Sequence, residues 1–567
     1  MVRERSLALA SCLLLAGCGR VDPRQFPLAA PVLRDQDLDS VTLPCDGKPD
    51  CAPKRRVSYL LWDAVDSSVF RPASNALRVR RGGAARDVNA YDEVPDSSFF
   101  TNRIGARAMS ADEVQAGYCA AGALPDPEAA DGSWRIDHGK DDGQSLGFRV
   151  KIAGTRYLFK LDEAQGEQAT AATAIAARLY HAAGFWAPCD SVVYFRRSLL
   201  EVAPNLSVQG NTGTRRRLDD AEVDRELSHA HRRGPLFRAA ASRWLPGVPV
   251  GPFAYQGTKD DDPNDVVPHE QRRPVRAARL MAAWLGHFDA REQNTMATWL
   301  PDDPARPGKG HVRHWIMDLG DSLGLRWTND GFSRRLNHAY FFDPGYLVED
   351  FVTLGIPQRP WDRVRIRAGL EDFGYFDAEH FDPEMWRPEY PMLPFQNMTE
   401  ADGAWMARII ARFEPEHVAA AVRAGDLSQE THTRFLTDTL VKRQRAILRR
   451  YFHELSPLTD LHYEARELCA VDLARKTGTY PEGAFRYEAT VRRGVGAVVR
   501  AAVRSQAQGL LCVDLPAVAP DGGTSDDAAS RYVVVRIENG ASRGPLVLHL
   551  YDLGPRTGLR LVGVERP

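Results

Sequence analysis

Alternating apolar and polar residues predict a small β-rich unit at residues 133–196. Residues 147–152 and 156–161 are typical of two strands, and the short glycine-containing segment between them is typical of a hairpin turn. An alanine-rich run over residues 167–183 follows and predicts a helix that ends at Gly184. This unit therefore combines a hairpin with one helix.

A second β region is predicted at the C-terminal end of the chain. Residues 532–537 and 546–551 alternate apolar and polar side chains over lengths that are typical of strands. We expect residues 456–567 to form a small β domain.

The pattern between these two regions changes twice. Residues 197–271 are rich in charged residues and predict a loop-rich insertion. Residues 272–455 predict mostly helix, with a strand-like passage near 311–326. The expected fold class is therefore α+β.

The N-terminal residues predict an export signal. Residues 1–5 are positively charged, and the eleven apolar residues 7–17 have the length of a signal-peptide core, too short for a membrane helix. Residues 15–18, Leu-Ala-Gly-Cys, resemble the bacterial lipobox, in which the cysteine is lipidated. An ordinary secretory signal with a chance cysteine is the alternative. The resemblance implies a signal peptide at 1–17, a lipid on Cys18 and an anchor on a membrane surface.

By the same resemblance, Gly19 after the cysteine favours sorting to the outer membrane, so the expected location is the cell envelope. Residues 18–132 are rich in Pro, Asp and Arg and predict an extended tether followed by irregular structure. Within this segment, residues 86–98 predict an ordered loop, because Phe99 and Phe100 follow directly and can bury it against the main body.

Export places the cysteines in an oxidising compartment and predicts disulfides. Cys12 leaves with the signal and Cys18 carries lipid, so six cysteines remain. A metal site is less favoured, because the chain has no CxxC spacing. The two predicted pairs join close or neighbouring segments: Cys45 with Cys51, across a tight polar turn, and Cys469 with Cys512, both in the C-terminal region.

Length and charge limit the functional classes. A chain of 567 residues predicts about two to four domains. Its 73 basic and 75 acidic residues give a formal net charge of -2, which argues against a nucleic-acid partner bound through bulk positive charge.

Lys160 is the first candidate binding residue. The chain has only nine lysines, so arginine is its usual cation, and lysine differs from it as a compact point charge. Lys160 ends the second predicted strand, which suits binding of phosphate oxygens and pairing with a carboxylate such as Glu167. The glycine-punctuated loop around Gly143 precedes the hairpin. A surface lysine on an edge strand is the alternative interpretation.

Three polar residues in the helical stretch have the spacing of a phosphoryl-transfer site. Asn294 follows Asp289 by five residues, and Asp318 begins an Asp-Leu-Gly sequence after an apolar run. Phosphoryl transfer needs an aspartate near the acceptor hydroxyl, and an asparagine and a second aspartate that hold Mg²⁺.

With these residues the chain resembles the atypical protein-kinase-like superfamily. The helix at 175–188 is similar to one in HipA-like toxin kinases, and residues 287–294 are similar to the catalytic loops of HipA-like, CotH-like and lipid kinases. The resemblance spans roughly residues 135–455. It implies a two-lobed protein-kinase-like fold with a small β-rich lobe at 133–196 and a larger helical lobe at 272–455.

The resemblance also implies roles and cofactors. Lys160 and Gly143 would bind the phosphates of ATP, Glu167 would fix Lys160, Asp289 would be the catalytic base, and Asn294 and Asp318 would hold Mg²⁺. Glu163 is an alternative to Glu167.

Two departures leave two functional hypotheses. The glycine loop lacks a GxGxxG motif, and ATP is scarce outside the cytoplasm. The first hypothesis is a phosphotransferase whose acceptor is an unknown protein or small molecule. The second is a pseudokinase-like envelope lipoprotein that binds a ligand or protein without turnover.

Overall fold

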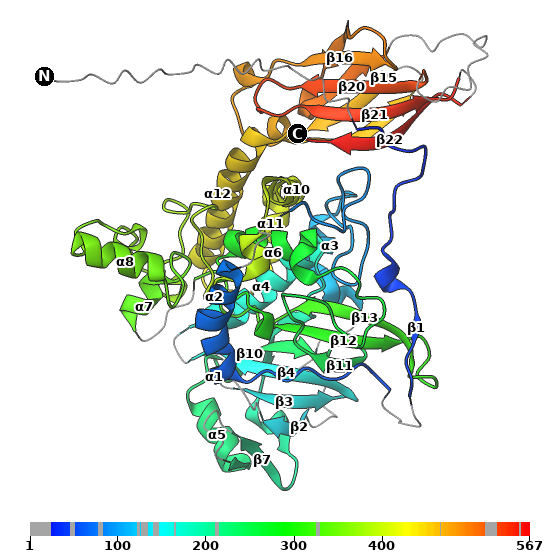
Figure 1. The fold of residues 1–567 in the computed structure, drawn as a ribbon. Coiled ribbons are helices and arrows are strands. Elements are labelled where there is room, and N and C mark those ends of the chain that lie inside the picture. Colours follow the sequence, from blue (N-terminus) through cyan, green and yellow to red (C-terminus); the bar gives the residue numbers. More distant parts are fainter. Residues whose placement is uncertain are drawn as a thin grey trace, which may run out of the picture.

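The computed structural model describes residues 24–45, 51–77, 83–121, 125, 134–139, 147–163, 166–209, 215–324, 329–464, 467–515, 530–554 and 557–567. The fold is mixed α+β (Figure 1). In the view of Figure 1, two larger sheets and the two-stranded sheet of β7 (Leu206–Gln209) and β8 (Arg215–Leu218) lie at the bottom, a group of helices lies in the middle, and two further sheets lie at the top.

The first sheet has the strand order β5-β10-β4-β3-β2-β6, with the short β9 paired to β10. The predicted hairpin is present, because β3 and β4 pair antiparallel over its whole length. Trp134, Phe148 and Phe159 are buried in the core of this sheet. The strands are β2 (Trp134–Gly139), β3 (Gly147–Ile152), β4 (Thr155–Leu161), β5 (Asp190–Phe195), β6 (Leu200–Val202), β9 (Arg232–Arg233) and β10 (Leu236–Arg243).

The prediction of a loop-rich insertion at 197–271 is wrong at β10, which lies inside the first sheet between β4 and β5. Charge is not a reliable sign of a loop here, because Arg238 of this strand is fully buried together with Ala239, Ala240 and Ala241. The same stretch also contains β7 (Leu206–Gln209), β8 (Arg215–Leu218) and α5 (Asp220–Ser228).

Helix α4 (Gln168–Ala183) contacts β5 and β10 of this sheet. It is the predicted alanine-rich helix, and its small side chains allow close packing, since almost all of them are buried. It ends as predicted at Gly184, whose φ of 125° favours glycine.

The second sheet has the order β1-β13-β12-β11. The strand-like passage predicted near 311–326 corresponds to β13, which ends at residue 316, so its second half is not a strand. The strands are β1 (Val41–Thr42), β11 (Val248–Gly251), β12 (Thr295–Pro301) and β13 (Lys309–Ile316).

The largest core lies among four helices and α4. Trp284, Trp405 and Met406 are fully buried there. The four helices are α6 (Arg273–Leu285), α10 (Glu400–Ile410), α11 (Pro415–Arg423) and α12 (Glu430–Glu454).

The prediction that residues 272–455 are mostly helical is wrong between 317 and 399. The helices described in that stretch are short, and the rest of its described chain is loop. Prolines are frequent there and prevent long helices, because each removes a backbone donor. The longer of these helices are α7 (Asp330–Arg335), α8 (Pro344–Thr353) and α9 (Leu393–Gln396).

The described part of the N-terminal segment packs along the body. It contains α1 (Leu60–Val65), α2 (Arg71–Ala76) and α3 (Ala111–Ala116). The expected ordered loop at 86–98 is present, and Phe99 and Phe100 after it are buried.

Two sheets that share one core form the C-terminal part, and the strands predicted from the alternating pattern are present as β20 and β21. One sheet has the order β14-β15-β19-β18 and the other β17-β16-β20-β21-β22. The elements are β14 (Leu458–Glu464), β15 (Glu467–Asp472), α13 (Leu473–Lys476), β16 (Glu488–Arg493), β17 (Val499–Ala501), β18 (Val503–Ser505), β19 (Leu510–Asp514), β20 (Tyr532–Glu538), β21 (Leu546–Asp552) and β22 (Leu559–Glu565).

Three disulfides are present, and both predicted pairs are confirmed. Cys45 bonds Cys51, and Cys469 bonds Cys512 across two neighbouring strands. The third joins Cys119 to Cys189 and so links the segment after α3 to the start of β5. In the described part of the chain, every helix is too short or too polar to cross a bilayer.

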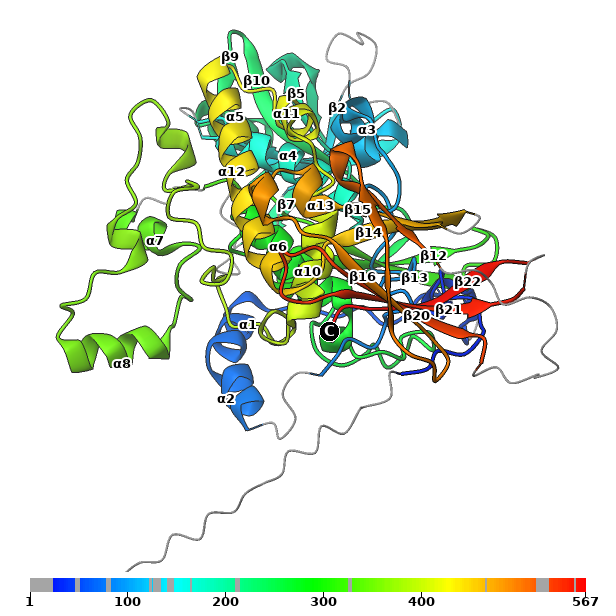
Figure 2. The ribbon, with the colours of Figure 1, turned by 90° about the horizontal axis from the view of Figure 1, so that it is seen from above.

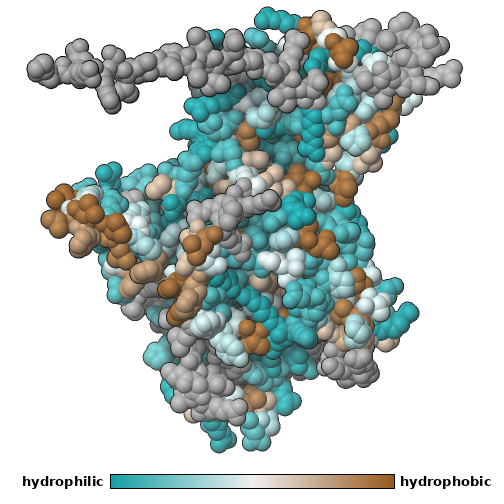
Figure 3. Space-filling view, viewed as in Figure 1, coloured by the Kyte–Doolittle hydropathy of each residue, from teal (hydrophilic) through white to brown (hydrophobic). Residues whose placement is uncertain are grey.

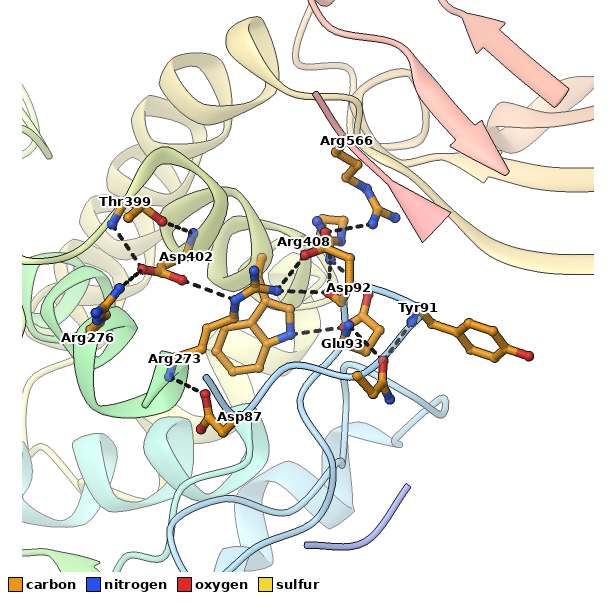
Figure 4. A network of polar contacts seen from close by, with 12 residues as sticks. Asp87, Tyr91, Asp92, Glu93, Arg273, Arg276, Thr399, Asp402, Arg408 and Arg566 are labelled. Atoms are coloured by element: carbon orange, nitrogen blue, oxygen red, sulfur yellow. Dashed lines mark hydrogen bonds and ion pairs between the residues drawn. The ribbon is translucent and has the colours of Figure 1, made fainter. Parts of the chain in front are cut away.

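A buried ionic network joins the C-terminal sheets to the helices (Figure 4). Arg273 of α6, Arg408 of α10 and Arg566 after β22 all form ion pairs with Asp92 in the ordered loop. Although burial opposes it, these arginines hold the pKa of Asp92 below its usual value. The network therefore ties three distant parts of the sequence to one carboxylate.

Candidate functional site

Lys160 lies near the end of β4 and forms an ion pair with Asp318. Only 13% of its side chain is exposed. Burial alone would lower the pKa of Lys160, but the carboxylates of Asp318, Asp190 and Asp321 outweigh it and raise this pKa above its usual value. Lys160 is therefore a half-buried, charged lysine held by acidic groups, not an isolated surface lysine.

Asp318 follows β13 at a sharp change of backbone direction. Its φ is 58°, in the left-handed region that aspartate tolerates better than most residues. Two residues later, a Cβ atom at Gly320 would lie 3.2 Å from Thr173 Oγ1 of α4, so glycine allows this segment to approach the helix closely. Gln168 Nε2 also donates to Ser322 O at 2.5 Å. Helix α4 thus positions the segment that carries Asp318.

Asp289 and Asn294 lie in the connection between α6 and β12. Helix α6 ends at Gly286, which has φ 65°, and the chain then turns to bring Asp289 into the interior, where it is 6% exposed. Asn294 Nδ2 donates to Asp289 Oδ2 at 2.6 Å and to the Asp289 carbonyl at 2.9 Å. The five-residue spacing therefore closes a compact loop in which the amide holds the carboxylate.

His287 supports this loop from behind. Its Nε2 lies 3.2 Å from Asp289 Oδ1, and its Nδ1 lies 3.1 Å from Tyr180 Oη of α4. His287 and Tyr180 are both fully buried, so the His287 ring fills the space between Tyr180 of α4 and Asp289.

Asp321 belongs to the same group, although sequence reasoning missed it. Burial and the neighbouring charges of Asp289 and Asp318 raise its pKa well above the usual value, while Lys160 opposes the rise. The signal in the sequence was its position three residues after Asp318 in an otherwise apolar and glycine-rich segment.

A further acid lies on the sheet side of Lys160. Asp190, at the start of β5, is 1% exposed. Burial raises its pKa to about 6, against the effects of a hydrogen bond with Ser242 and the charge of Lys160. Together with Asp318 and Asp321, it surrounds the lysine with more negative than positive charge.

Arg291 and Glu389 lie on the other side of the Asp289 loop. Arg291 Nη1 forms an ion pair with Glu389 Oε1 at 2.6 Å, and Glu389 N donates to the Phe288 carbonyl at 2.7 Å. Next to them is a small surface hollow, which Arg291, Gln293 and Arg71 line together with Tyr390. Arg71 also pairs with the buried Glu292 at 2.8 Å.

The pairing of Glu167 with Lys160 is corrected by the structure. Glu167 precedes α4, and this end of the helix lies against the segment between α11 and α12, where Glu167 Oε2 accepts a hydrogen bond from the Ser428 backbone N–H at 2.7 Å. Its Oε1 lies 3.2 Å from Arg233 Nη2. Asp318 takes the place beside Lys160 that Glu167 was expected to occupy. The alternative, Glu163, forms a backbone bridge with Ala230.

Two other predicted residues lie outside the described part of the chain: Gly143, in the glycine-punctuated loop, and Cys18, the expected lipidation site. Of the predicted site residues that are described, Lys160, Asp289, Asn294 and Asp318 are brought together, and Glu167 is not.

The donor set at this site fits Mg²⁺. Asp318, Asp321 and Asn294 offer the oxygen ligands that hard cations prefer. In the described ranges, one group brings three possible metal-ligand atoms of His, Cys, Asp or Glu within 4.8 Å of one another. It consists of Glu467, Cys469 and Cys512, and its two cysteines form a disulfide. Among the described residues, the acids around Lys160 do not form such a group. Magnesium is usually held by one or two carboxylates together with substrate phosphates.

Comparisons with protein-family models, with curated proteins and with solved structures find no match to this chain.

Proposed function

We propose that this chain is an envelope lipoprotein, anchored through Cys18 to the outer membrane, with a two-lobed kinase-like body. The small β-rich lobe would contain the first sheet and α4, and the larger lobe the helices from α6 onward. In this proposal the body binds ATP with Mg²⁺ and transfers a phosphoryl group to an unknown protein or small-molecule acceptor. The ion pair between Lys160 and Asp318 carries the proposal, because it joins the two lobes at the residues that the sequence resemblance selects.

Each residue has a role that follows from its position. Lys160 is a point charge that can neutralise phosphate oxygens, and Asp318 with Asn294 would hold Mg²⁺. The bound cation would neutralise charge on the phosphate oxygens. Asp289 would accept the acceptor's hydroxyl proton as the new oxygen–phosphorus bond forms and the bond to the donor oxygen breaks. Asn294 holds the Asp289 carboxylate through a hydrogen bond to Oδ2, and His287 Nε2 lies 3.2 Å from Oδ1.

A second function is favoured by two observations. Asp289 is only 6% exposed, and Lys160 and Asp318 are bound to each other, so a nucleotide has to separate them. Both features suit a body that binds a ligand or protein without turnover. In that case the acidic group and Lys160 would serve recognition alone.

Two assays with the full chain and four variants can separate the two functions. We expect Mg²⁺–ATP to raise the unfolding temperature, with a stabilisation of about 2.7 kcal/mol at a ligand concentration one hundred times the Kd. Lys160→Ala and Asp318→Ala should abolish this shift, because each removes one half of the phosphate and metal site. Lys151→Ala is the matched control, since Lys151 is an exposed lysine on the adjacent strand β3.

Phosphoryl transfer from γ-labelled ATP to an envelope fraction measures turnover. Asp289→Asn should keep the thermal shift but stop the transfer, because the amide can still accept from Asn294 but cannot take a proton. A shift without transfer in the unaltered chain selects the binding function. A shift that survives Asp318→Ala contradicts the assigned site under both functions.

A further inference from the structure

Helix α8 exposes an apolar face that no described part of the chain covers. None of its residues is buried. Leu347, Val348, Phe351 and Val352 lie on one side of the helix and are 55 to 83% exposed, and Leu354 and Ile356 extend this face beyond the helix end. A ten-residue helix is only marginally stable alone in water, so this apolar face needs a partner.

The opposite side of α8 is fixed to the protein. Arg359 forms ion pairs with Glu349 and Asp350, and Tyr346 packs against Trp361 with ring centroids 5.0 Å apart. The polar side of the helix therefore points inward to its own arginine, and the apolar side is presented outward. A helix that packs on its own protein's core turns its apolar side inward, whereas α8 turns its apolar side outward.

A second apolar surface lies around α1 and around the helical turn of residues 66–70 that joins α1 to α2. Tyr59, Trp62, Val69 and Phe70 are exposed there, and Leu77 follows at the end of α2. In Figure 3, brown residues gather over α8 and over the α1–α2 segment on the same face of the molecule. Figure 2 shows that both lie along the lower edge when the molecule is seen from above.

Exposed cations lie close to both apolar surfaces along the sequence. Lys54 and Arg55 precede the α1–α2 surface, and Arg363 and Arg365 follow Trp361, which packs on α8. Apolar and aromatic side chains bordered by arginine and lysine are the composition of elements that lie in the interface of an anionic membrane. A bilayer is also flat and extended, so it can contact both surfaces at once.

We propose that α8 and the α1–α2 segment dock the protein onto an anionic phospholipid bilayer. Phe351, Leu347, Trp62 and Phe70 enter the region between the headgroups and the acyl chains, and the flanking cations face the phosphates. This contact is additional to the lipid on Cys18. It rests on the proposed envelope location but not on the nucleotide site.

Vesicle binding tests this proposal in the mature chain, residues 18–567, carrying Cys18→Ser, which has neither the lipid nor the apolar signal segment. The chain should co-float with vesicles of phosphatidylethanolamine and phosphatidylglycerol, and bind vesicles of phosphatidylcholine more weakly. Leu347→Asp with Phe351→Asp should reduce binding about tenfold or more, because two apolar anchors become charged. Val495→Asp is the matched control, because Val495 is fully exposed in the C-terminal part and should not contribute.

Quenching by brominated lipids locates the contact independently. Trp62 and Trp244 are 60 and 43% exposed, so both are accessible to solvent. Trp62→Phe should remove most of the quenching, whereas Trp244→Phe should leave it unchanged.

Three results would overturn the proposal: no binding of the Cys18→Ser chain to either vesicle, binding that the α8 substitutions leave unchanged, or a dimer in light scattering that the same substitutions dissolve. The last result assigns the α8 face to a second copy of the chain. The Mg²⁺–ATP shift should persist in the α8 variants, so failure at the membrane is distinguishable from failure at the nucleotide site.

Discussion

Among single residues, Glu389 shows how burial changes the charge of a carboxyl group beside the Asp289 loop. Burial raises its pKa from 4.5 to about 7, although Arg291 opposes the rise. The folded protein therefore binds this proton more tightly than the unfolded chain. The resulting destabilisation is fully present above pH 7, falls as the pH drops, and disappears below about pH 4.5.

We expect Glu389→Gln to flatten the dependence of stability on pH between 7 and 4.5. In the unaltered chain, this carboxyl should make the protein up to about 3 kcal/mol less stable at pH 7.5 than at pH 4.5. Thermal unfolding at several pH values measures the difference between variant and parent. Glu379→Gln removes an exposed carboxylate that pairs with Arg367 and should leave the slope as it is. An equal slope in Glu389→Gln and in the parent would contradict the shifted pKa.

Among the elements, the end of α6 determines where the Asp289 loop begins. Gly286 has φ 65°, and a Cβ atom there would lie 3.0 Å from Phe376 Cε2. Glycine therefore serves both the left-handed backbone and the close approach of an aromatic ring. The three residues that follow bring the Asp289 side chain beside Asn294.

We expect Gly286→Ala to destabilise the protein by about 2 kcal/mol, from a left-handed alanine and a tight ring contact. Gly257→Ala provides the comparison, because Gly257 has φ 74° but open space around its Cβ position. Gly257→Ala should lower the free energy of unfolding by only about 1 kcal/mol, because it places alanine in the left-handed region without a ring contact. Chemical denaturation of both variants gives the two values. Equal losses of stability in the two variants would show that the Phe376 ring moves aside without a cost in free energy.

Across the whole molecule, the Asp92 network couples the C-terminal sheets to the helical part. Arg566 is buried, and its Nη1 lies 2.9 Å from Asp92 Oδ2. Arg566 also donates to the carbonyl groups of Ser456 and Leu458, on the chain that enters β14. One side chain near the C-terminus thus holds the start and the end of the C-terminal sheets against the body.

We expect Arg566→Ala to destabilise the protein by about 3 kcal/mol, because it removes one partner from a buried ionic group. Calorimetry should also separate the unfolding of the C-terminal sheets from that of the rest. Arg543→Ala is the control, since Arg543 pairs with Glu454 but is 70% exposed, and it should change stability by less than about 1 kcal/mol. A single unchanged transition in Arg566→Ala would show that the network does not couple these parts.

The sequence predicted helices and strands best where apolar residues recur with the period of one kind of element. The β3–β4 hairpin, the alanine-rich α4 with Gly184, and the strands β20 and β21 follow from residue pattern alone, because each buries a regular face. Strand β10 was missed because its partners β4 and β5 lie far from it in sequence. Residues 236–243 lie in a charged stretch of the sequence, but pairing with these distant strands makes them part of a sheet.

The candidate site was predicted in part for the same reason. The spacing of Asp289 and Asn294 fixes a local loop, so their hydrogen bond could be foreseen. Asp321 and the separation of Glu167 from Lys160 could not, because they depend on how α4 packs between the β13 end and the α11–α12 connection.

The amino-acid sequence alone determined the cysteine pair at 45–51, the hairpin, and the polar residues available for chemistry, because these depend on short spacings and side-chain type. It also indicated the pair at 469–512, because both cysteines lie in the predicted C-terminal β domain. Tertiary structure decided which acid stands beside Lys160, how much charge surrounds it, and which apolar faces stay exposed. These properties depend on distances between segments far apart in the chain, and packing of the whole molecule sets those distances.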